Sequence, residues 1–75
     1  MSKVILDVKN LNCPLPVIHT RKAMRNLESG AVLEILTTDP ASIRDFNALC
    51  RSTGSDLINQ SESQGIYTFQ IRKGA

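Results

Sequence analysis

The stretch Cys13-Pro14-Leu15-Pro16 combines a nucleophilic side chain with two prolines at alternate positions, and an amphipathic run follows it as far as Leu27. Proline fits the first turn of a helix, where backbone N–H groups have no intrahelical partner, and disrupts the later turns. The register that suits both rings makes Cys13 the N-cap and Pro14 the first helical residue. Because a residue that precedes proline resists helical geometry, a start at Leu15 is the alternative. Both registers place the sulfur at the amide-rich end of a helix.

A thiol in this position can act as a nucleophile, since the helix dipole and the free amides of the first turn stabilise a thiolate. We therefore predict that the amides of Leu15 and Val17 help to hold the anion. The pKa of the Cys13 thiol is expected to lie modestly below its ordinary value. Pro14 and Pro16 are expected to keep the sulfur pointing outward. The alternative is a small buried hydrophobe, the usual fate of a free cysteine, but a helix N-cap is not a typical hydrophobic slot.

Other kinds of cysteine chemistry find little support. His19 is the only histidine, and it lies on a different side of the expected helix from Cys13, so we expect it to be exposed. No CxxC pair supplies a resolving thiol. Cys13, His19 and Cys50 have neither the number nor the spacing of a zinc site, and no metal or separate cofactor is predicted. Cys50 shares a helical stripe with Ile43 and Phe46, which indicates a core cysteine.

Composition limits the class of protein. The 75 residues form one domain, residues 1–75, near the lower size limit for folding without disulfides or metals. A net charge of +2 does not by itself indicate direct nucleic-acid binding. No apolar run is long enough to span a membrane, and no leader with a basic start and a long apolar segment is seen. We predict a cytoplasmic protein with free thiols.

Hydrophobic periodicity predicts the order βαβαββ. Strands are expected at 4–8, 31–37, 56–62 and 66–72, and helices at 14–27 and from 40 to about 54. Strand-helix-strand crossovers are right-handed and make their strands parallel. The predicted fold is therefore an α/β protein of the α+β two-layer sandwich kind, with two helices on one face of a four-stranded mixed sheet.

This order brings two helix starts together. Cys13 follows the carboxyl end of the first strand and Asp39 follows that of the second, and open α/β sheets bind ligands at this end. The two helix N-termini should converge beside the cysteine, and both favour negative charge. Asp39 could be a general acid, but capping of the second helix, with Pro40 at its first position, explains it fully.

Three basic residues recur at three- and four-residue spacing along the first helix: Arg21, Lys22 and Arg25. They lie roughly opposite its apolar stripe. A solvated face and a docking surface for an acidic partner or RNA remain equally open interpretations.

Several of these segments together resemble one known family. The motif from Leu6-Asp7 through Lys9-Asn10-Leu11-Asn12 to Cys13-Pro14-Leu15-Pro16 is similar to the signature of the TusA (SirA-like) sulfur-carrier proteins. So are Thr38-Asp39-Pro40-Ala41, Arg44-Asp45 and Ile71-Arg72-Lys73-Gly74. The resemblance covers essentially the whole chain.

The resemblance implies a sulfurtransferase-type carrier that acts by persulfide relay, in which Cys13 holds sulfane sulfur covalently. Family members receive the sulfur from a cysteine desulfurase or a rhodanese-type protein and pass it to an acceptor protein. The pathways served include tRNA thiolation, molybdenum-cofactor sulfuration and sulfur oxidation. Two alternatives are a small protein-interaction or regulatory domain whose cysteine never turns over, and a thiol redox sensor.

The chain departs from the family pattern in two places. Asn10 stands where glycine is usual, and because asparagine tolerates positive φ, we expect the loop to keep its shape. Phe46-Asn47 stands where an isoleucine-proline pair is common, and this change is expected to alter the partner-facing surface of the second helix.

Overall fold

Four strands and two helices follow one another as the sequence predicts in the computed structural model, which describes residues 3–74. They are β1 (Lys3–Asp7), α1 (Leu15–Arg25), β2 (Val32–Thr37), α2 (Ser42–Thr53), β3 (Asp56–Ser63) and β4 (Ile66–Arg72). The two hairpin strands lie within one residue of their expected bounds. Both helices start one or two residues later than expected, and α1 also ends two residues earlier.

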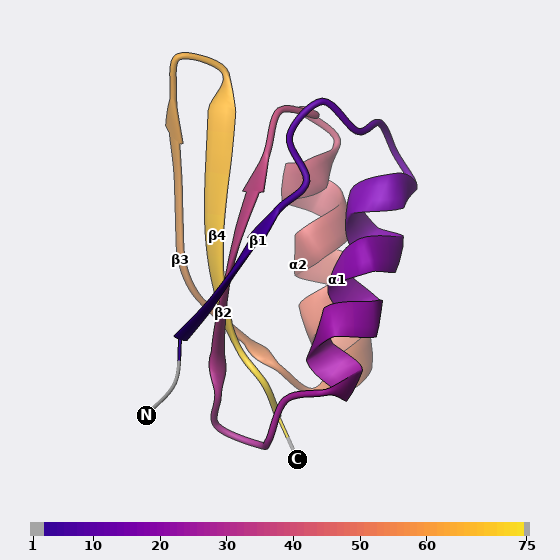
Figure 1. The fold of residues 1–75 in the computed structure, drawn as a ribbon, viewed down its shortest axis with the longest axis vertical. Coiled ribbons are helices and arrows are strands. Elements are labelled where there is room, and N and C mark those ends of the chain that lie inside the picture. The colour runs from indigo at the N-terminus through magenta and orange to yellow at the C-terminus, as the bar shows by residue number, and fades with distance from the viewer. Residues whose placement is uncertain (1–2, 75) are drawn as a thin grey trace.

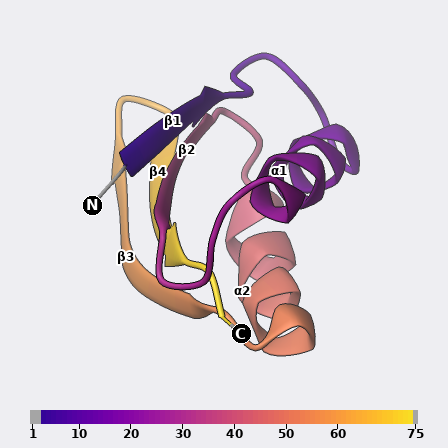
Figure 2. The same ribbon diagram turned by 60° about the horizontal axis from the view of Figure 1, so that its bottom comes forward.

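The sheet has the strand order β1-β2-β4-β3. β1 pairs with β2 in parallel, and β4 runs antiparallel to both of its neighbours. α1 and α2 lie side by side on one face of this mixed sheet (Figure 1, Figure 2). The predicted two-layer sandwich is therefore confirmed. β4 lies between β2 and β3, the two strands that α2 connects. No helix within residues 3–74 is long and apolar enough to cross a membrane.

The core lies between the sheet and the helices. Alternate residues of the two central strands are fully buried on the helix-covered face: Leu33 and Ile35 of β2, and Phe69 and Ile71 of β4. Phe46 of α2 packs on this surface, with its ring centroid 4.8 Å from that of Phe69. This strict alternation is the period-two pattern of a sheet with one covered face.

The stripe predicted on the second helix is only partly correct. Cys50 is 5% exposed and belongs to the core, as expected, but Ile43 is 39% exposed. Ile43 lies in the first turn of α2, above a shallow groove that Gln60 and Glu62 of β3 also line. Tyr67 and Phe69 of β4 line the same groove, but they leave the Ile43 side chain partly exposed.

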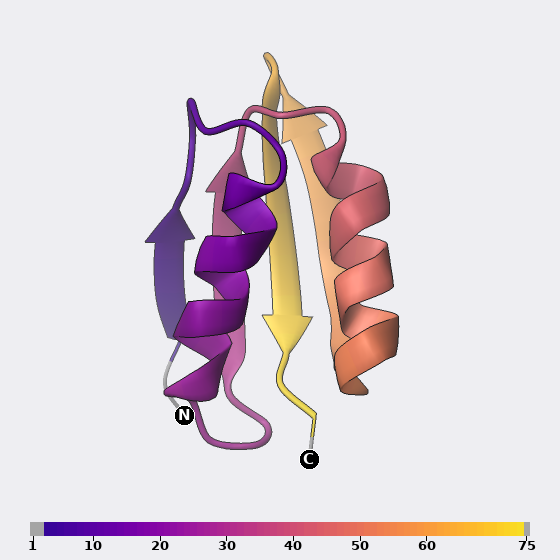
Figure 3. The ribbon, with the colours of Figure 1, turned by 90° about the vertical axis from the view of Figure 1, so that its right-hand side faces the viewer.

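The loops that follow β1 and β2 lie at the same end of the molecule (Figure 3). Asn10 in the first loop has φ of 69°, the left-handed conformation that asparagine accepts at little strain, and the expectation for this position is confirmed. Its N–H donates to Thr38 Oγ1 in the second loop at 2.9 Å. This hydrogen bond joins the two loops directly.

Candidate functional site

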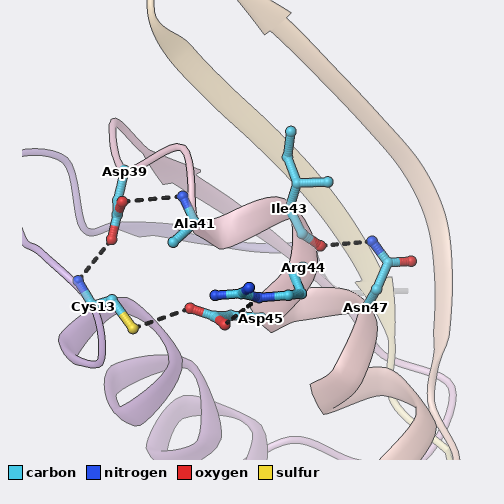
Figure 4. A network of polar contacts seen from close by, with 7 residues as sticks. All are labelled: Cys13, Asp39, Ala41, Ile43, Arg44, Asp45 and Asn47. Carbon is cyan, nitrogen blue, oxygen red and sulfur yellow. Dashed lines mark hydrogen bonds and ion pairs between the residues drawn. The ribbon is translucent and has the colours of Figure 1, made fainter.

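Cys13 and Asp39 lie together where these two loops meet, as the parallel crossover predicts. The backbone N–H of Cys13 donates to Asp39 Oδ2 at 2.7 Å. The other carboxylate oxygen, Oδ1, accepts the N–H of Ala41 at 3.1 Å. A single carboxylate thus holds the main chain of both loops and fixes the position of the cysteine backbone (Figure 4).

Asp39 does this without being the N-cap of α2. The helix begins at Ser42, with Ala41 in the cap position and no side-chain cap, so the predicted start at residue 40 is wrong by two residues. The reason is that Asp39 closes a tight turn onto Ala41 N–H, and this turn occupies the residues expected in the first helical turn. Thr37 Oγ1 accepts the N–H of Asp39 at 3.1 Å and shares a 3.0 Å hydrogen bond with Ser42 Oγ.

The start of α1 follows the alternative register. The helix begins at Leu15, with Pro14 in the cap position and no side-chain cap, so Cys13 is not the N-cap. Pro16 is the second helical residue and is buried, and the Cys13–Pro14 peptide bond is cis. Leu15 N–H donates to the Asn12 carbonyl at 2.9 Å. The predicted hydrogen bond from this amide to the sulfur is therefore wrong, because the backbone of the loop has already taken the donor.

The sulfur of Cys13 instead contacts a second carboxylate. Cys13 Sγ donates to Asp45 Oδ2 at 3.2 Å (Figure 4). Asp45 belongs to the first turn of α2, and its side chain is 23% exposed. Its other oxygen lies 4.0 Å from Nε of Arg44, whose side chain is 85% exposed. The sequence reasoning did not identify Asp45 as a neighbour of the thiol. The available signal was the convergence of the two helix starts.

The electrostatics reverse the predicted direction of the pKa shift. The hydrogen bond to Asp45 raises the pKa of the Cys13 thiol above its ordinary value, and loss of solvation and the negative charges of Asp45 and Asp39 act in the same direction. Only Arg44 opposes them. The first turn of α2 and the loop before it therefore place the carboxylates of Asp45 and Asp39 near the cysteine, and the start of α1 has no acidic residue in its first turn. These contacts therefore favour the protonated thiol of Cys13 over its thiolate.

A groove of about 330 Å³ runs from the thiol along the junction of the two helices. Its lining is apolar near the middle and polar at both ends: Cys13, Pro14, Val17, Arg21, Asp45, Ala48, Leu49 and Ser52. Val17, which we expected to offer its amide, here contributes a wall of the groove. The exposed sulfur thus lies at one end of a concave surface rather than on a flat one.

The three basic residues of α1 are all exposed but do not share one surface. Arg21 lines the groove that contains Cys13, and its Nη2 lies 3.4 Å from Ser52 Oγ. Arg25 lines a neighbouring groove of about 260 Å³, together with Arg21 and Lys73. Lys22 lines neither of these grooves. Arg21 is therefore the basic residue best placed to meet a partner at the thiol.

Neither cysteine is in a disulfide: Cys13 is exposed and Cys50 is buried. His19 is exposed, as expected. Within residues 3–74, no three His, Cys, Asp or Glu side chains gather as a metal site. The chemistry offered by this site is that of one accessible thiol with two carboxylates beside it.

Comparison with known proteins gives a consistent result. The family model described as Sulfurtransferase TusA matches residues 4–73. The sulfur carrier protein TusA of Allochromatium vinosum is 41% identical over 68 residues, covering 91% of this chain and 90% of that protein. The putative sulfur carrier protein YrkI of Bacillus subtilis is 44% identical over 73 residues, 97% of each chain. The crystal structure of a SirA-like protein from Desulfitobacterium hafniense has the same fold, with a TM-score of 0.83 at 24% identity over 96% of this chain and 99% of that one.

Proposed function

The chain belongs to the TusA family of sulfurtransferases and sulfur carriers, and from this premise we propose that Cys13 carries sulfane sulfur as a persulfide. The observation that carries the proposal is the position of Cys13. Its sulfur is exposed at the head of a groove, while its backbone is fixed by Asp39. A carrier needs this combination, because the reactive atom must be reachable by two different partners and still be held in a constant place.

Loading is a sulfur transfer without net oxidation or reduction. The Cys13 thiol loses its proton, and the resulting thiolate attacks the outer sulfur of a donor persulfide. The S–S bond of the donor breaks, and its electron pair leaves with the donor thiolate, which takes up a proton. In the second transfer an acceptor thiolate attacks the terminal sulfur on Cys13, and Cys13 leaves as the thiolate.

The position of the second cysteine supports a carrier over a dithiol oxidoreductase. Cys50 is buried in the core, within α2, and it cannot reach the loaded sulfur to close a disulfide. The persulfide would therefore persist until the thiol of another protein attacks it. The same burial argues against a redox sensor that uses the two cysteines of this chain as a pair.

The partners we propose are a donor protein, of the cysteine desulfurase or rhodanese type, and an acceptor protein in a cytoplasmic pathway. That pathway is tRNA thiolation, molybdenum-cofactor sulfuration or sulfur oxidation. Docking of an acidic donor surface is proposed to use Arg21 first, with Arg25 and Lys22 adding attraction at longer range. The position of Arg21 in the same groove as the thiol supports this order.

The test is the mass of the protein after incubation with a cysteine desulfurase and free cysteine. Wild-type protein should gain one sulfur atom that dithiothreitol removes. Cys13→Ser should gain none, and Cys50→Ser should gain as much as the wild type. A gain that persists in Cys13→Ser, or no gain with any persulfide donor, would overturn the proposal and favour an interaction domain.

A further inference from the structure

Asp45 is the carboxylate that touches the sulfur. We propose that Asp45 is a positioning residue that keeps empty Cys13 protonated and unreactive and, once sulfur is loaded, disfavours the persulfide anion so that the sulfur is released. The second half of this inference rests on the proposed carrier function, whereas the first half concerns the thiol alone.

The geometry of the contact shows which form of the cysteine it stabilises. Asp45 Oδ2 lies 3.2 Å from Cys13 Sγ, and an ionised carboxylate can only accept hydrogen bonds. The contact therefore requires the proton to be on the sulfur. Asp45 is held in place because its backbone N–H donates to the Ala41 carbonyl at 3.1 Å in the first turn of α2.

The other charges around the sulfur do not cancel this effect. Asp39 approaches from the β2–α2 loop through the Cys13 backbone. Arg44 on α2 is the cation nearest to Asp45, but its side chain is 85% exposed and 4.0 Å away, and such exposed pairs contribute little. Arg21 faces the same groove from α1 and contacts Ser52. Two carboxylates thus act on the thiol against the single exposed guanidinium of Arg44, in agreement with the raised pKa of Cys13.

The loaded state meets the same carboxylate with the opposite result. A persulfide is expected to be more acidic than its parent thiol, so at neutral pH it is an anion. Its terminal sulfur then has no proton to donate to Asp45, and the like charges repel. Asp45 therefore stabilises the empty thiol and destabilises the loaded anion. Both effects shift the sulfur exchange between Cys13 and an external thiol toward release.

The first test needs no sulfur transfer. The rate of alkylation of Cys13 by iodoacetamide is followed by mass spectrometry from neutral to alkaline pH, for wild type, Asp45→Asn, Asp45→Glu and Glu28→Gln. Asp45→Asn should shift the midpoint of the profile to lower pH and raise the rate at neutral pH several-fold. Asp45→Glu keeps the charge and should stay close to the wild type.

Glu28→Gln is the matched control, because it removes one carboxylate at an exposed position beyond the far end of α1. Its profile should superimpose on that of the wild type. Circular dichroism and thermal unfolding check that each variant is folded, so that a change in the profile reports on the thiol. An Asp45→Asn profile with the wild-type midpoint in a folded protein would overturn the inference.

The second test is the fraction of Cys13 that is loaded at equilibrium with glutathione persulfide and glutathione. Asp45→Asn should carry several-fold more sulfur than the wild type at the same ratio, and Glu28→Gln should match the wild type. Equal loading in Asp45→Asn would overturn the release half. A shifted alkylation midpoint in a protein that never loads would refute the carrier function and its release step, while leaving the control of the thiol by Asp45 in place.

Discussion

Replacing Asp39 with alanine should both loosen the backbone at Cys13 and lower the stability of the fold. The carboxylate accepts two backbone hydrogen bonds, from Cys13 at 2.7 Å and from Ala41 at 3.1 Å. Hydrogen bonds to charged groups contribute about 1.5–3 kcal/mol each when they are buried. Asp39 is only partly buried, so water recovers part of the loss, and we expect Asp39→Ala to lower the free energy of unfolding by about 2 kcal/mol in total.

This loss is large for a domain of 75 residues. Globular proteins have about 0.05–0.15 kcal/mol of stability per residue, which gives about 4–11 kcal/mol here. A change of 1 kcal/mol shifts the melting temperature of so small a domain by about 4–8 °C. Asp39→Ala should therefore melt about 8–16 °C below the wild type. Asp39→Asn keeps one acceptor oxygen and should lose about half as much stability.

Urea unfolding followed by circular dichroism measures the effect as a change in midpoint at constant slope. The control is Asp7→Ala, which removes a carboxylate that accepts the Lys9 N–H at 3.0 Å within its own exposed segment and should change the midpoint far less. Hydrogen exchange at the Cys13 amide should accelerate in Asp39→Ala, since its acceptor is gone. If Asp39→Ala and Asp7→Ala unfolded at the same urea concentration, the bridging role assigned to Asp39 would be refuted.

The remaining predictions concern the core and the basic face. Cys50→Ala should lose about 1–2 kcal/mol through the missing volume while sulfur loading stays intact, and native Cys50 should alkylate far more slowly than the exposed thiol. Burial, and then the charge of Asp56, raise the pKa of Cys50 above the ordinary 9.0. The stability that comes from the protonated Cys50 thiol is therefore present at neutral pH and is lost as the pH rises through the raised pKa. In urea unfolding at alkaline pH, the free energy of unfolding should fall more steeply with pH for wild type than for Cys50→Ala. Phe46→Ala should cost about 3–5 kcal/mol, and retention of a wild-type melting temperature would contradict its assignment to the core. Arg21→Glu should slow transfer from a protein donor and weaken its salt dependence, with Lys22→Glu weaker in effect and loading from a small donor unchanged in both. Equal transfer rates in wild type and Arg21→Glu would return this side chain to the solvated surface.

The sequence by itself determined the order of elements, the face of the sheet that is covered and the meeting of the two loops. Period-two and helical spacing of apolar residues record which side of each element is buried, and the handedness of the crossovers then places Cys13 near Asp39. The burial of Cys50 followed from the same spacing. The tolerance of Asn10 for positive φ was also predictable, because it depends on one residue and its own backbone.

Only the tertiary structure decided the chemistry of the thiol. The partner of Cys13 Sγ is Asp45, which lies 32 residues away in the sequence, and the direction of the pKa shift depends on that contact. The sequence predicted that helix-start amides would contact the sulfur, but the Leu15 N–H donates to the Asn12 carbonyl in the loop instead. Electrostatic interactions of an exposed group fall steeply with distance in water. The charge state of Cys13 therefore depends on which side chains of other segments come within a few ångströms of its sulfur. Hydrophobic periodicity does not predict these contacts.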